Sequence, residues 1–474
     1  MTETSLLGLR TVTTSACADR VPGPATGPHS PRHSSHRIWH RLGTIAIVAA
    51  LLPGCVNTKF RTDAALPGFV SADEPRAAAI GREILNQGGT AGDAAAAMAL
   101  AMTATLPSRV GLTGGGVCVA FDAAKKEART IDFLPRTAGP GGAAMPALLR
   151  GIAALQATAG TMRWEQVAVP AEQVAQFSPG VSRALVQDLT DYGNRLPGDS
   201  EMRRRLMPAG GVPAIGTTLS QPELAATLSQ IRRNGVPAFY TGQIGTALAQ
   251  GLGIDLATLR AFQPKITGTV KVPLGIVDAH FAQLPETATG TGLAEAWKAV
   301  AELPPAERAA RAARLLGAGG RGAGVPGAGL VAMDMNENSV ACALTMGAPF
   351  GNGRSIPGTG LLAAQGVTTG GFGAPGLVAN SIVGRSLFTG VGTATGDDGP
   401  AAGPAALLAA ILPSALDERG AEAIAASIAP DQPGRSQFVA CQVAQENGVK
   451  TCKTGADPRG AAMGAMIAKE RPRE

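Results

Sequence analysis

The fold of this chain follows from residues 88–121, which read GGTAGDAAAAMALAMTATLPSRVGLTGGGVCVAF. The pattern predicts a helix that begins near Asp93 and ends before Pro107, and glycines 114–116 then lead into a strand over 117–121. The helix side chains are small, which indicates close packing against a sheet. The glycine triplet precedes a strand, and no Lys-Ser or Lys-Thr follows it. A turn is therefore favoured over a phosphate-binding loop.

The segments around this stretch continue a mixture of helices and strands. Ser220 to Glu223 has the composition of a capping box, and the helix that it opens should close at Gly235. The same cues predict further helices that begin near Asp73, Gln243, Gly292, Pro404 and Gly420. Strands are expected over 130–133, 281–285, 330–335, 339–345, 438–443 and 449–452. The whole pattern indicates an α/β (α+β) protein.

Composition limits the function classes. Of the 474 residues 45% are hydrophobic but only 4% aromatic, so the core must consist largely of Ala, Val, Leu and Ile. The net charge is +6, and residues 1–54 supply +3 of it through five arginines against Glu3 and Asp19. No basic cluster is interleaved with aromatic residues, so nucleic-acid binding has no support.

Histidines are scarce in the body of the chain. Four of the five precede residue 41, and only His280 remains. A zinc site built on several histidines is thereby excluded, and we expect no metal and no cofactor. A Ser-His-Asp or Cys-His catalyst would have to use His280. This residue lies in a strand-like segment, which favours a structural imidazole.

The N-terminal region has the pattern of an export signal. Arg37 and Arg41 precede an apolar run over 42–52, and Pro53-Gly54-Cys55 follows. These are the parts of a secretory signal, and the run is too short to span a bilayer permanently. The end of the run also resembles a bacterial lipobox, in which Cys55 would be lipidated. We therefore expect an exported protein of the bacterial envelope, anchored by lipid in the periplasm, with plain secretion as the alternative.

Export makes disulfides possible. Two β-like segments near the C-terminus carry Cys441 and Cys452 and flank Asn447-Gly448, a hairpin signal. If the loop covers 445–448, the two cysteines lie directly opposite each other. A two-residue loop would offset them, so whether the bond can form depends on the length of the loop.

The composition of the chain changes in the middle, where a glycine-rich segment separates two larger parts. Residues 1–54 form the leader, which we exclude from the fold. A large first part covers 55–314, and a second part covers 330–474. The glycine-rich segment 315–329 between them reads as a flexible connector within one joint domain.

Several local motifs, in this order, resemble the gamma-glutamyltransferase family (glutathione hydrolases). They cover most of the chain after about residue 68. The matching segments are Gly88–Ala95, Gly111–Gly116, Asp132-Phe133, Gln221–Leu228, Ala238–Gly242, Asp334–Phe350, Pro357–Leu362 and Ala456–Ala462.

This resemblance implies a four-layer αββα sandwich of the N-terminal-nucleophile hydrolase type. Members of the family are made as a precursor that cuts itself into two subunits. The threonine exposed by the cut attacks a gamma-glutamyl bond, and its own amine can serve as the base. The resemblance makes a small gamma-glutamyl compound the expected ligand, and it leaves any protein partner unknown.

Carried over residue by residue, the resemblance places the nucleophile position on Gly327. The supporting second threonine falls on Thr345, and the asparagine two residues later falls on Gly347. The substrate-binding acid and serines fall near 363–366 and 376–377, where no such residues stand.

The remaining substrate-binding positions are also altered. The arginine expected after Asp132-Phe133 is absent, although Arg136 stands close by and could substitute. The glycine pair of the oxyanion hole has a loose counterpart around Gly390 and Gly392.

One observation does not depend on any alignment. Between Thr291 and Ser339 there is no Ser, Thr or Cys, so a cut anywhere in these 47 residues would expose no nucleophile. The favoured hypothesis is an uncleaved, catalytically degenerate protein that binds a ligand or partner. The alternatives are chemistry relocated to Thr345, Ser339 or Ser381, and an active family member with a displaced active site.

Two polar groups also have simpler interpretations. Thr345 could be a strand hydroxyl satisfied within the sheet. Asp397-Asp398 lies in a glycine-rich loop and is expected to be solvated.

Overall fold

The structure is a computed structural model that describes residues 68–178, 180–196, 201–284, 289–318, 324–368, 371–443 and 449–467. All of these ranges lie in the compact unit Phe60–Glu474. The leader and Cys55 lie outside the described residues. Within the described ranges, no helix combines the length and apolar character needed to cross a membrane.

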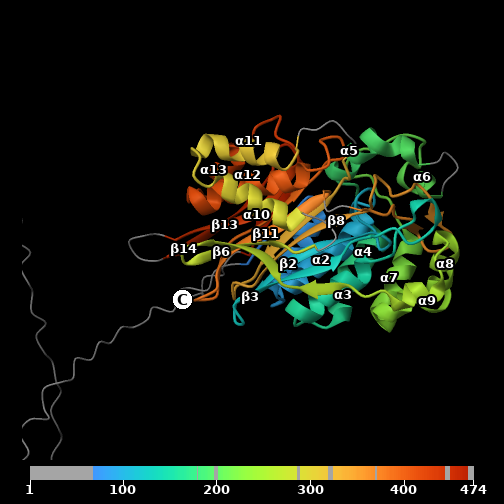
Figure 1. Cartoon of the computed structure of the whole chain (residues 1–474). Helices are drawn as coiled ribbons and strands as arrows, with labels where there is room; N and C mark the ends of the chain where they lie inside the picture. The colour runs from blue at the N-terminus through green and yellow to red at the C-terminus, as the bar shows by residue number, and fades with distance from the viewer. Residues whose placement is uncertain are drawn as a thin grey trace, which may run out of the picture. The chain divides into compact units, whose positions relative to one another are not determined.

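Two antiparallel sheets form the centre of the molecule (Figure 1). The strand order of the first sheet is β15-β1-β7-β8-β2-β3-β4, and that of the second is β14-β13-β12-β11-β6-β5. The strands of the first sheet are β1 (Phe69–Ala72), β2 (Gly115–Asp122), β3 (Glu127–Phe133), β4 (Lys265–Thr267), β7 (Ala328–Met333), β8 (Ser339–Thr345) and β15 (Met463–Met466). Those of the second are β5 (Thr269–Leu274), β6 (Val277–Ala282), β11 (Gly373–Asn380), β12 (Arg385–Thr393), β13 (Arg435–Val443) and β14 (Lys450–Ala456). Short strands β9 (Ser355–Ile356) and β10 (Leu361–Leu362) pair separately.

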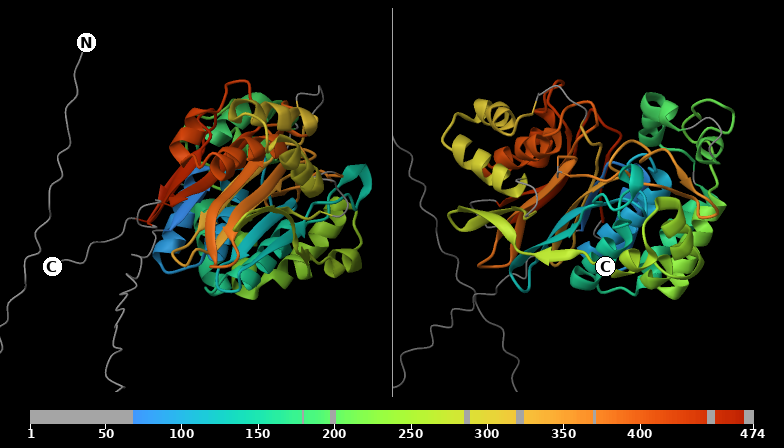
Figure 2. Two further views of the ribbon diagram at one scale, coloured as in Figure 1. Left: turned by 60° about the vertical axis from the view of Figure 1, so that its left-hand side comes forward. Right: turned by 45° about the vertical axis from the view of Figure 1, so that its right-hand side comes forward.

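Helices cover the outer face of each sheet (Figure 2). The first sheet packs directly against α1 (Pro75–Asn86), α2 (Ala91–Thr105) and α3 (Leu148–Ala159). The same apolar cluster extends outward to α4 (Trp164–Phe177), α5 (Arg183–Tyr192), α6 (Glu201–Leu206), α7 (Pro222–Asn234), α8 (Gly242–Leu252) and α9 (Leu256–Ala261). The second sheet packs against α10 (Thr289–Val300), α12 (Ala402–Leu416) and α13 (Ala421–Ala426), and α11 (Pro305–Leu315) packs on α10 and α12. A third apolar cluster, which includes Val119, Val331 and Val391, fills the space between the sheets.

The order of layers is therefore helix, sheet, sheet, helix. The α2 helix explains how the first two layers fit together, since all fifteen of its residues are buried and nine are alanine or glycine. Thr90 is the N-cap of this helix, and the Asp93 side chain accepts a hydrogen bond from the Thr90 amide, which completes a capping box. The helix therefore begins at Ala91, two residues before the predicted start near Asp93.

Two local expectations were wrong. Ser220 does not cap α7: its hydroxyl donates to the Gln176 carbonyl, and Gln221 occupies the cap position. The connector is also shorter than predicted, because β7 begins at Ala328 and residues 326–329 are buried. At residues 326–329, burial in the sandwich replaces the flexibility that the glycine-rich composition suggested.

Candidate functional site

The position that the resemblance assigns to the nucleophile lies at the start of β7, in the interior of the first sheet. The backbone nitrogen of Gly327 donates to the Ala394 carbonyl at 2.9 Å, and its carbonyl accepts from Arg109 Nη1 at 3.2 Å. Both backbone groups of Gly327 are thus satisfied by protein partners.

There is no room for a side chain at this position. A Cβ atom on Gly327 would lie 2.3 Å from the Phe372 carbonyl oxygen and 3.4 Å from that of Leu344. The first distance is far inside van der Waals contact with backbone, which cannot rotate away as a side chain does. Glycine at 327 therefore allows the strand to pack closely against its neighbours.

Thr345 ends β8 beside this position and is fully buried. Its hydroxyl donates to the Pro326 carbonyl at 2.7 Å and accepts from the Gly347 amide at 2.9 Å. The hydroxyl therefore binds the segment before Gly327 and the turn after β8. This use agrees with a satisfied structural hydroxyl more closely than with a nucleophile.

The substrate-clamp positions have been reorganised as well. Gly347 has a φ of +76°, and a Cβ there would lie 1.8 Å from the Gln365 carbonyl oxygen. An asparagine would need a different backbone path at this point. Gly376 and Leu377 lie inside β11, with Leu377 buried between the sheets, so neither faces an open site.

The three residues considered for substrate binding are not brought together. Arg136 pairs with Asp132 at 2.8 Å and keeps its side chain partly exposed. Gly390 and Gly392 lie within β12, which is paired on one side with β11 and on the other with β13. A Cβ on Gly392 would lie 2.1 Å from the Gly403 carbonyl oxygen, so this glycine permits α12 to approach the sheet.

Asp398 is not simply solvated, contrary to expectation. Its carboxylate accepts hydrogen bonds from the amides of Thr395 (3.0 Å), Gly396 (3.3 Å) and Gly434 (2.8 Å). Consecutive amides of this kind form a concave anion-binding site. Because the chain fills that site with its own carboxylate, the loop after β12 is fastened close to residue 327.

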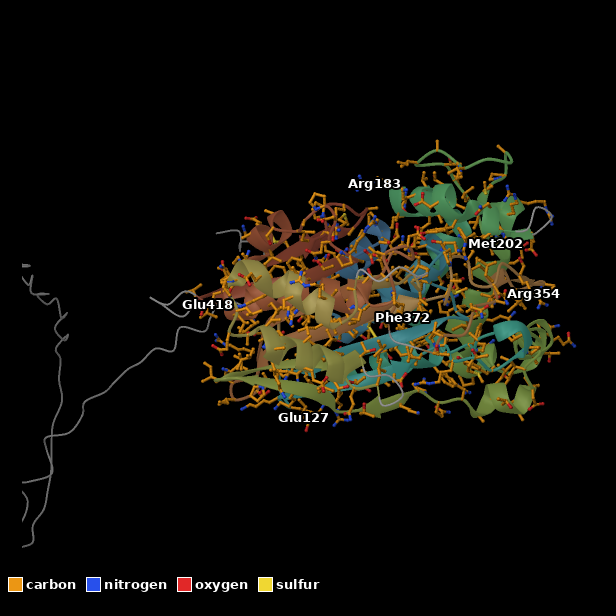
Figure 3. All side chains as sticks on the ribbon, turned by 45° about the horizontal axis from the view of Figure 1, so that its top comes forward. Glu127, Arg183, Met202, Arg354, Phe372 and Glu418 are labelled. Atoms are coloured by element: carbon orange, nitrogen blue, oxygen red, sulfur yellow. A yellow bond between two sulfur atoms is a disulfide. The ribbon has the colours of Figure 1, made fainter. Side chains whose placement is uncertain are left out.

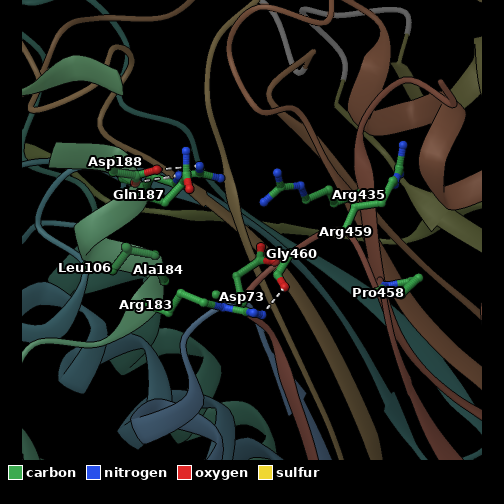
Figure 4. A pocket seen from close by; sticks show the side chains of 12 residues that line it. Asp73, Leu106, Arg183, Ala184, Gln187, Asp188, Arg435, Pro458, Arg459 and Gly460 are labelled. Atoms are coloured by element: carbon green, nitrogen blue, oxygen red, sulfur yellow. Dashed lines mark hydrogen bonds and ion pairs between the residues drawn. The ribbon is translucent and has the colours of Figure 1, made fainter. Parts of the chain in front are cut away.

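A charged pocket of about 180 Å³ lies beside these residues and was not foreseen from the sequence. Its wall includes Asp73, Asp188 and four arginines: Arg109, Arg183, Arg435 and Arg459. Figure 4 shows that these side chains come from distant parts of the chain and surround one space. No short motif contains them, so only the folded structure reveals the pocket.

A buried ion pair forms one wall of this charged pocket. Arg109 binds Asp188 in a bidentate arrangement, with Nη2–Oδ1 at 2.6 Å and Nε–Oδ2 at 2.8 Å. The Ser108 hydroxyl also donates to Asp188. Burial by itself lowers the pKa of Arg109, but the charge and hydrogen bonds of Asp188 raise it overall. Arg109 is thus held charged next to residue 327.

Asp73 connects the charged pocket to the start of β7. Its carboxylate accepts from the Gly329 amide at 2.6 Å and from Gln437 Nε2 at 2.9 Å. Burial raises the pKa of Asp73, and the nearby charge of Arg109 opposes this shift. The carboxylate organises backbone in the region where the two expected halves of the chain meet.

Two disulfides join neighbouring strands. Cys441 and Cys452 stand directly opposite each other on β13 and β14 and are bonded. The sequence did not suggest the second bond, between Cys118 on β2 and Cys342 on β8. The sequence separation of 224 between these two cysteines leaves no local signal, whereas a hairpin marks the first pair.

His280 is buried in β6, remote in the topology from β7. Its Nδ1 lies 2.8 Å from the Thr269 hydroxyl, and Nε2 has no hydrogen-bond partner among the described residues. Burial lowers the pKa of His280 to about 4 from the ordinary 6.5. The imidazole is thus neutral and structural, as its strand context indicated.

The buried imidazole should make stability depend on pH. Because its folded pKa lies below the unfolded value, the unfolded chain binds more protons between pH 6.5 and about 4. Stability should fall by about 3 kcal/mol as pH is lowered through this window. His280→Leu should remove that part of the slope in urea unfolding measured at pH 7 and pH 4.5. An unchanged slope would contradict the assignment.

Comparison with known proteins relates the chain to one family by sequence. Residues 77–304 match the sequence model of the family described as gamma-glutamyltranspeptidase. Glutathione hydrolase 7 from Bos taurus is 31% identical over 192 residues, which are 37% of this chain and 28% of that protein. Glutathione hydrolase proenzyme from Bacillus subtilis is 28% identical over 214 residues, 40% of this chain and 36% of that protein. The matches thus span about a third of the length of these relatives.

Solved structures match over more of the chain. Cephalosporin acylase from Bacillus halodurans superimposes with a TM-score of 0.66 and 16% identity, covering 85% of this chain and 96% of that chain. A second structure, LmbA2991HD, gives 0.60 at 16% identity, with 85% and 98% covered. At such identities these likenesses show the fold alone. They confirm the predicted αββα sandwich of the N-terminal-nucleophile hydrolase type. The sequence matches, namely the family model over residues 77–304 and the glutathione hydrolases, support membership of this chain in the gamma-glutamyltransferase family.

Proposed function

We propose that this chain is an uncleaved gamma-glutamyltransferase-like protein that has lost the family's catalysis and binds a ligand or partner. One observation carries the proposal. The nucleophile position holds Gly327, and a Cβ there would lie 2.3 Å from the Phe372 carbonyl oxygen. The loss of the nucleophile is therefore accompanied by packing that excludes a replacement.

The neighbouring positions support the same proposal. The Thr345 hydroxyl donates to one protein group and accepts from another, and there is no space at Gly347 for the family's asparagine. A redesigned active enzyme would keep at least one group that holds the substrate in place. The joint loss of nucleophile and clamps favours a protein selected for binding.

The charged pocket is the place where we expect a ligand. It is smaller than pockets for drug-sized molecules, which measure about 300–1,000 Å³, and its arginines favour a carboxylate. A small gamma-glutamyl compound such as glutathione has that chemistry. Arg435→Gln should weaken its binding in calorimetry, and Arg260→Gln, on the exposed surface of α9, should not.

The cellular location is also a proposal. The apolar run over 42–52 and Cys55 support export to the bacterial envelope and attachment by lipid. Incorporation of labelled palmitate into the wild type, and its loss in Cys55→Ser, would test this attachment.

Restoring the threonine alone should not restore the enzyme. Gly327→Thr should lower the free energy of unfolding by about 1–3 kcal/mol through overpacking and should yield no cleavage at 327. The variant and the wild type should both release no chromogenic amine from a gamma-glutamyl anilide. Gly211→Thr is the matched control, because a Cβ at Gly211 meets nothing within 4 Å. Two fragments that meet at residue 327, or amine release by the wild type, would overturn the proposal.

A further inference from the structure

Several chain reversals meet at one end of the sandwich. The turns 123–126, 334–338 and 381–384 touch each other: the Ala123 amide donates to Asn338 Oδ1 at 3.0 Å, and Lys126 Nζ donates to the Ile382 carbonyl at 2.7 Å. The reversal at 275–276 joins them, because Asp278 pairs with Ala379 next to the 381–384 turn. We call this end of the molecule the turn end.

Exposed apolar side chains gather at the turn end. Of the twelve large apolar side chains that are exposed among the described residues, seven lie there: Ile276, Met335, Ile382, Val383, Val443, Val449 and Met466. The most exposed are Ile276 (71%), Ile382 (68%) and Val383 (58%). Single exposed apolar residues are ordinary, but a cluster at the tips of adjacent turns marks an interaction surface.

The first described strand, β1, also begins at the turn end. Phe69, the first residue of β1, pairs with Met333 beside the 334–338 turn and with Met466 on its other side. Cys55 lies 13 residues before Gly68. Thirteen residues span at most about 45 Å when fully extended. A lipid on Cys55 would therefore tether the chain within about that distance of a bilayer, and the tether joins the described residues at the turn end.

The charges at the turn end are nearly balanced. Lysines and arginines there form ion pairs with nearby carboxylates, among them Lys125–Asp122, Arg129–Glu127, Lys271–Asp278 and Lys450–Glu337. Glu127 marks this end in Figure 3, far from Met202 and Arg354. A surface with aliphatic tips and little net charge fits apolar insertion into lipid better than attraction to anionic headgroups.

We propose that the turn end is a membrane-contacting surface, with Ile276, Ile382 and Val383 inserted into the bilayer interface. Contact would add to the anchor on Cys55 and would determine which end of the molecule faces the bilayer. The bilayer would then lie at the end of the sandwich where the β-turns meet. This inference does not depend on whether the chain retains catalysis.

The test uses the chain from residue 56 onward, which keeps the compact unit Phe60–Glu474 but has no acyl group. Flotation should show binding to phosphatidylcholine vesicles and, to a similar extent, to vesicles of mixed phosphatidylethanolamine and phosphatidylglycerol. The double variant Ile382→Asp, Val383→Asp should reduce the bound fraction by roughly tenfold, because binding scales with the apolar area inserted. Ile215→Asp is the matched control, since Ile215 is 62% exposed but lies in the connection between α6 and α7, outside the chain reversals of the turn end. Its binding should equal that of the wild type.

Three results would overturn the proposal: a wild type that binds neither kind of vesicle, a double variant that binds as well as the wild type, or binding restricted to anionic vesicles. Light scattering adds a further check. A concentration-dependent dimer in the wild type that the double variant loses would assign the surface to a second copy of the chain. If the double variant has a lowered unfolding midpoint, Ile276→Asp in the separate 275–276 turn replaces it and should weaken binding in the same direction.

Discussion

Replacing Arg109 with methionine should lower the free energy of unfolding by about 3–5 kcal/mol. The change leaves Asp188 buried, with its side chain only 2% exposed, and without the guanidinium that neutralises it. It also removes the hydrogen bond to the Gly327 carbonyl. Urea unfolding followed by circular dichroism measures the loss.

A surface pair provides the control for Arg109. Arg129 and Glu127 form an ion pair with side chains 50% and 54% exposed, so Arg129→Met should cost less than about 1 kcal/mol. Adding Asp188→Leu to Arg109→Met should recover much of the lost stability, because removing both partners leaves no unpaired charge. Equal losses for Arg109→Met and Arg129→Met would show that the buried pair does not hold this region.

Removing the disulfide between β2 and β8 should have the second large effect. The double variant Cys118→Ala, Cys342→Ala should lose about 2–5 kcal/mol. The bond connects residues separated by 224 positions, so it restricts the unfolded chain far more than the hairpin bond between Cys441 and Cys452, whose separation is 11.

The hairpin disulfide is the natural control. In the chain-entropy description, Cys441→Ala, Cys452→Ala should cost about 2–3 kcal/mol less than removal of the long-range bond. Both double variants are compared with the oxidised wild type in urea. A larger loss from the hairpin pair would contradict the expected order.

The sequence predicted the parts of the fold that have local signals. The α2 helix follows from its alanines between Asp93 and Pro107, and the β7–β8 hairpin follows from alternating apolar residues around Asn336-Glu337-Asn338. The four-layer arrangement could be predicted only through the family resemblance. Periodicity does not say which face of a sheet meets another sheet.

The errors have a common physical cause, which is competition from tertiary contacts. Gln221 takes the cap position of α7 because its side chain donates to the Ala104 carbonyl at 2.7 Å in the core. Gly324 lies against the backbone of the loop after β12, and Gly327 lies against the carbonyls of Phe372 and Leu344. Neither contact can be inferred from neighbouring residues.

The candidate site, like the fold, could be predicted only in part from the sequence. The lack of a nucleophile between Thr291 and Ser339 could be predicted from the sequence alone, since no Ser, Thr or Cys occurs there. The steric reason that a larger residue does not fit at Gly327 could not be predicted, because it depends on the position of the Phe372 carbonyl in the folded structure. The charged pocket was equally hidden, since Asp73, Arg109 and Arg435 are brought together only by the strand order.

The central claim is that the chain is not cut at the nucleophile position. The most direct measurement is the intact mass of the purified protein under denaturing, reducing conditions. The account predicts one species that contains residues on both sides of Gly327, with the mass of the full mature chain. Two species whose masses sum to that chain, with a new terminus at or next to residue 327, would contradict it.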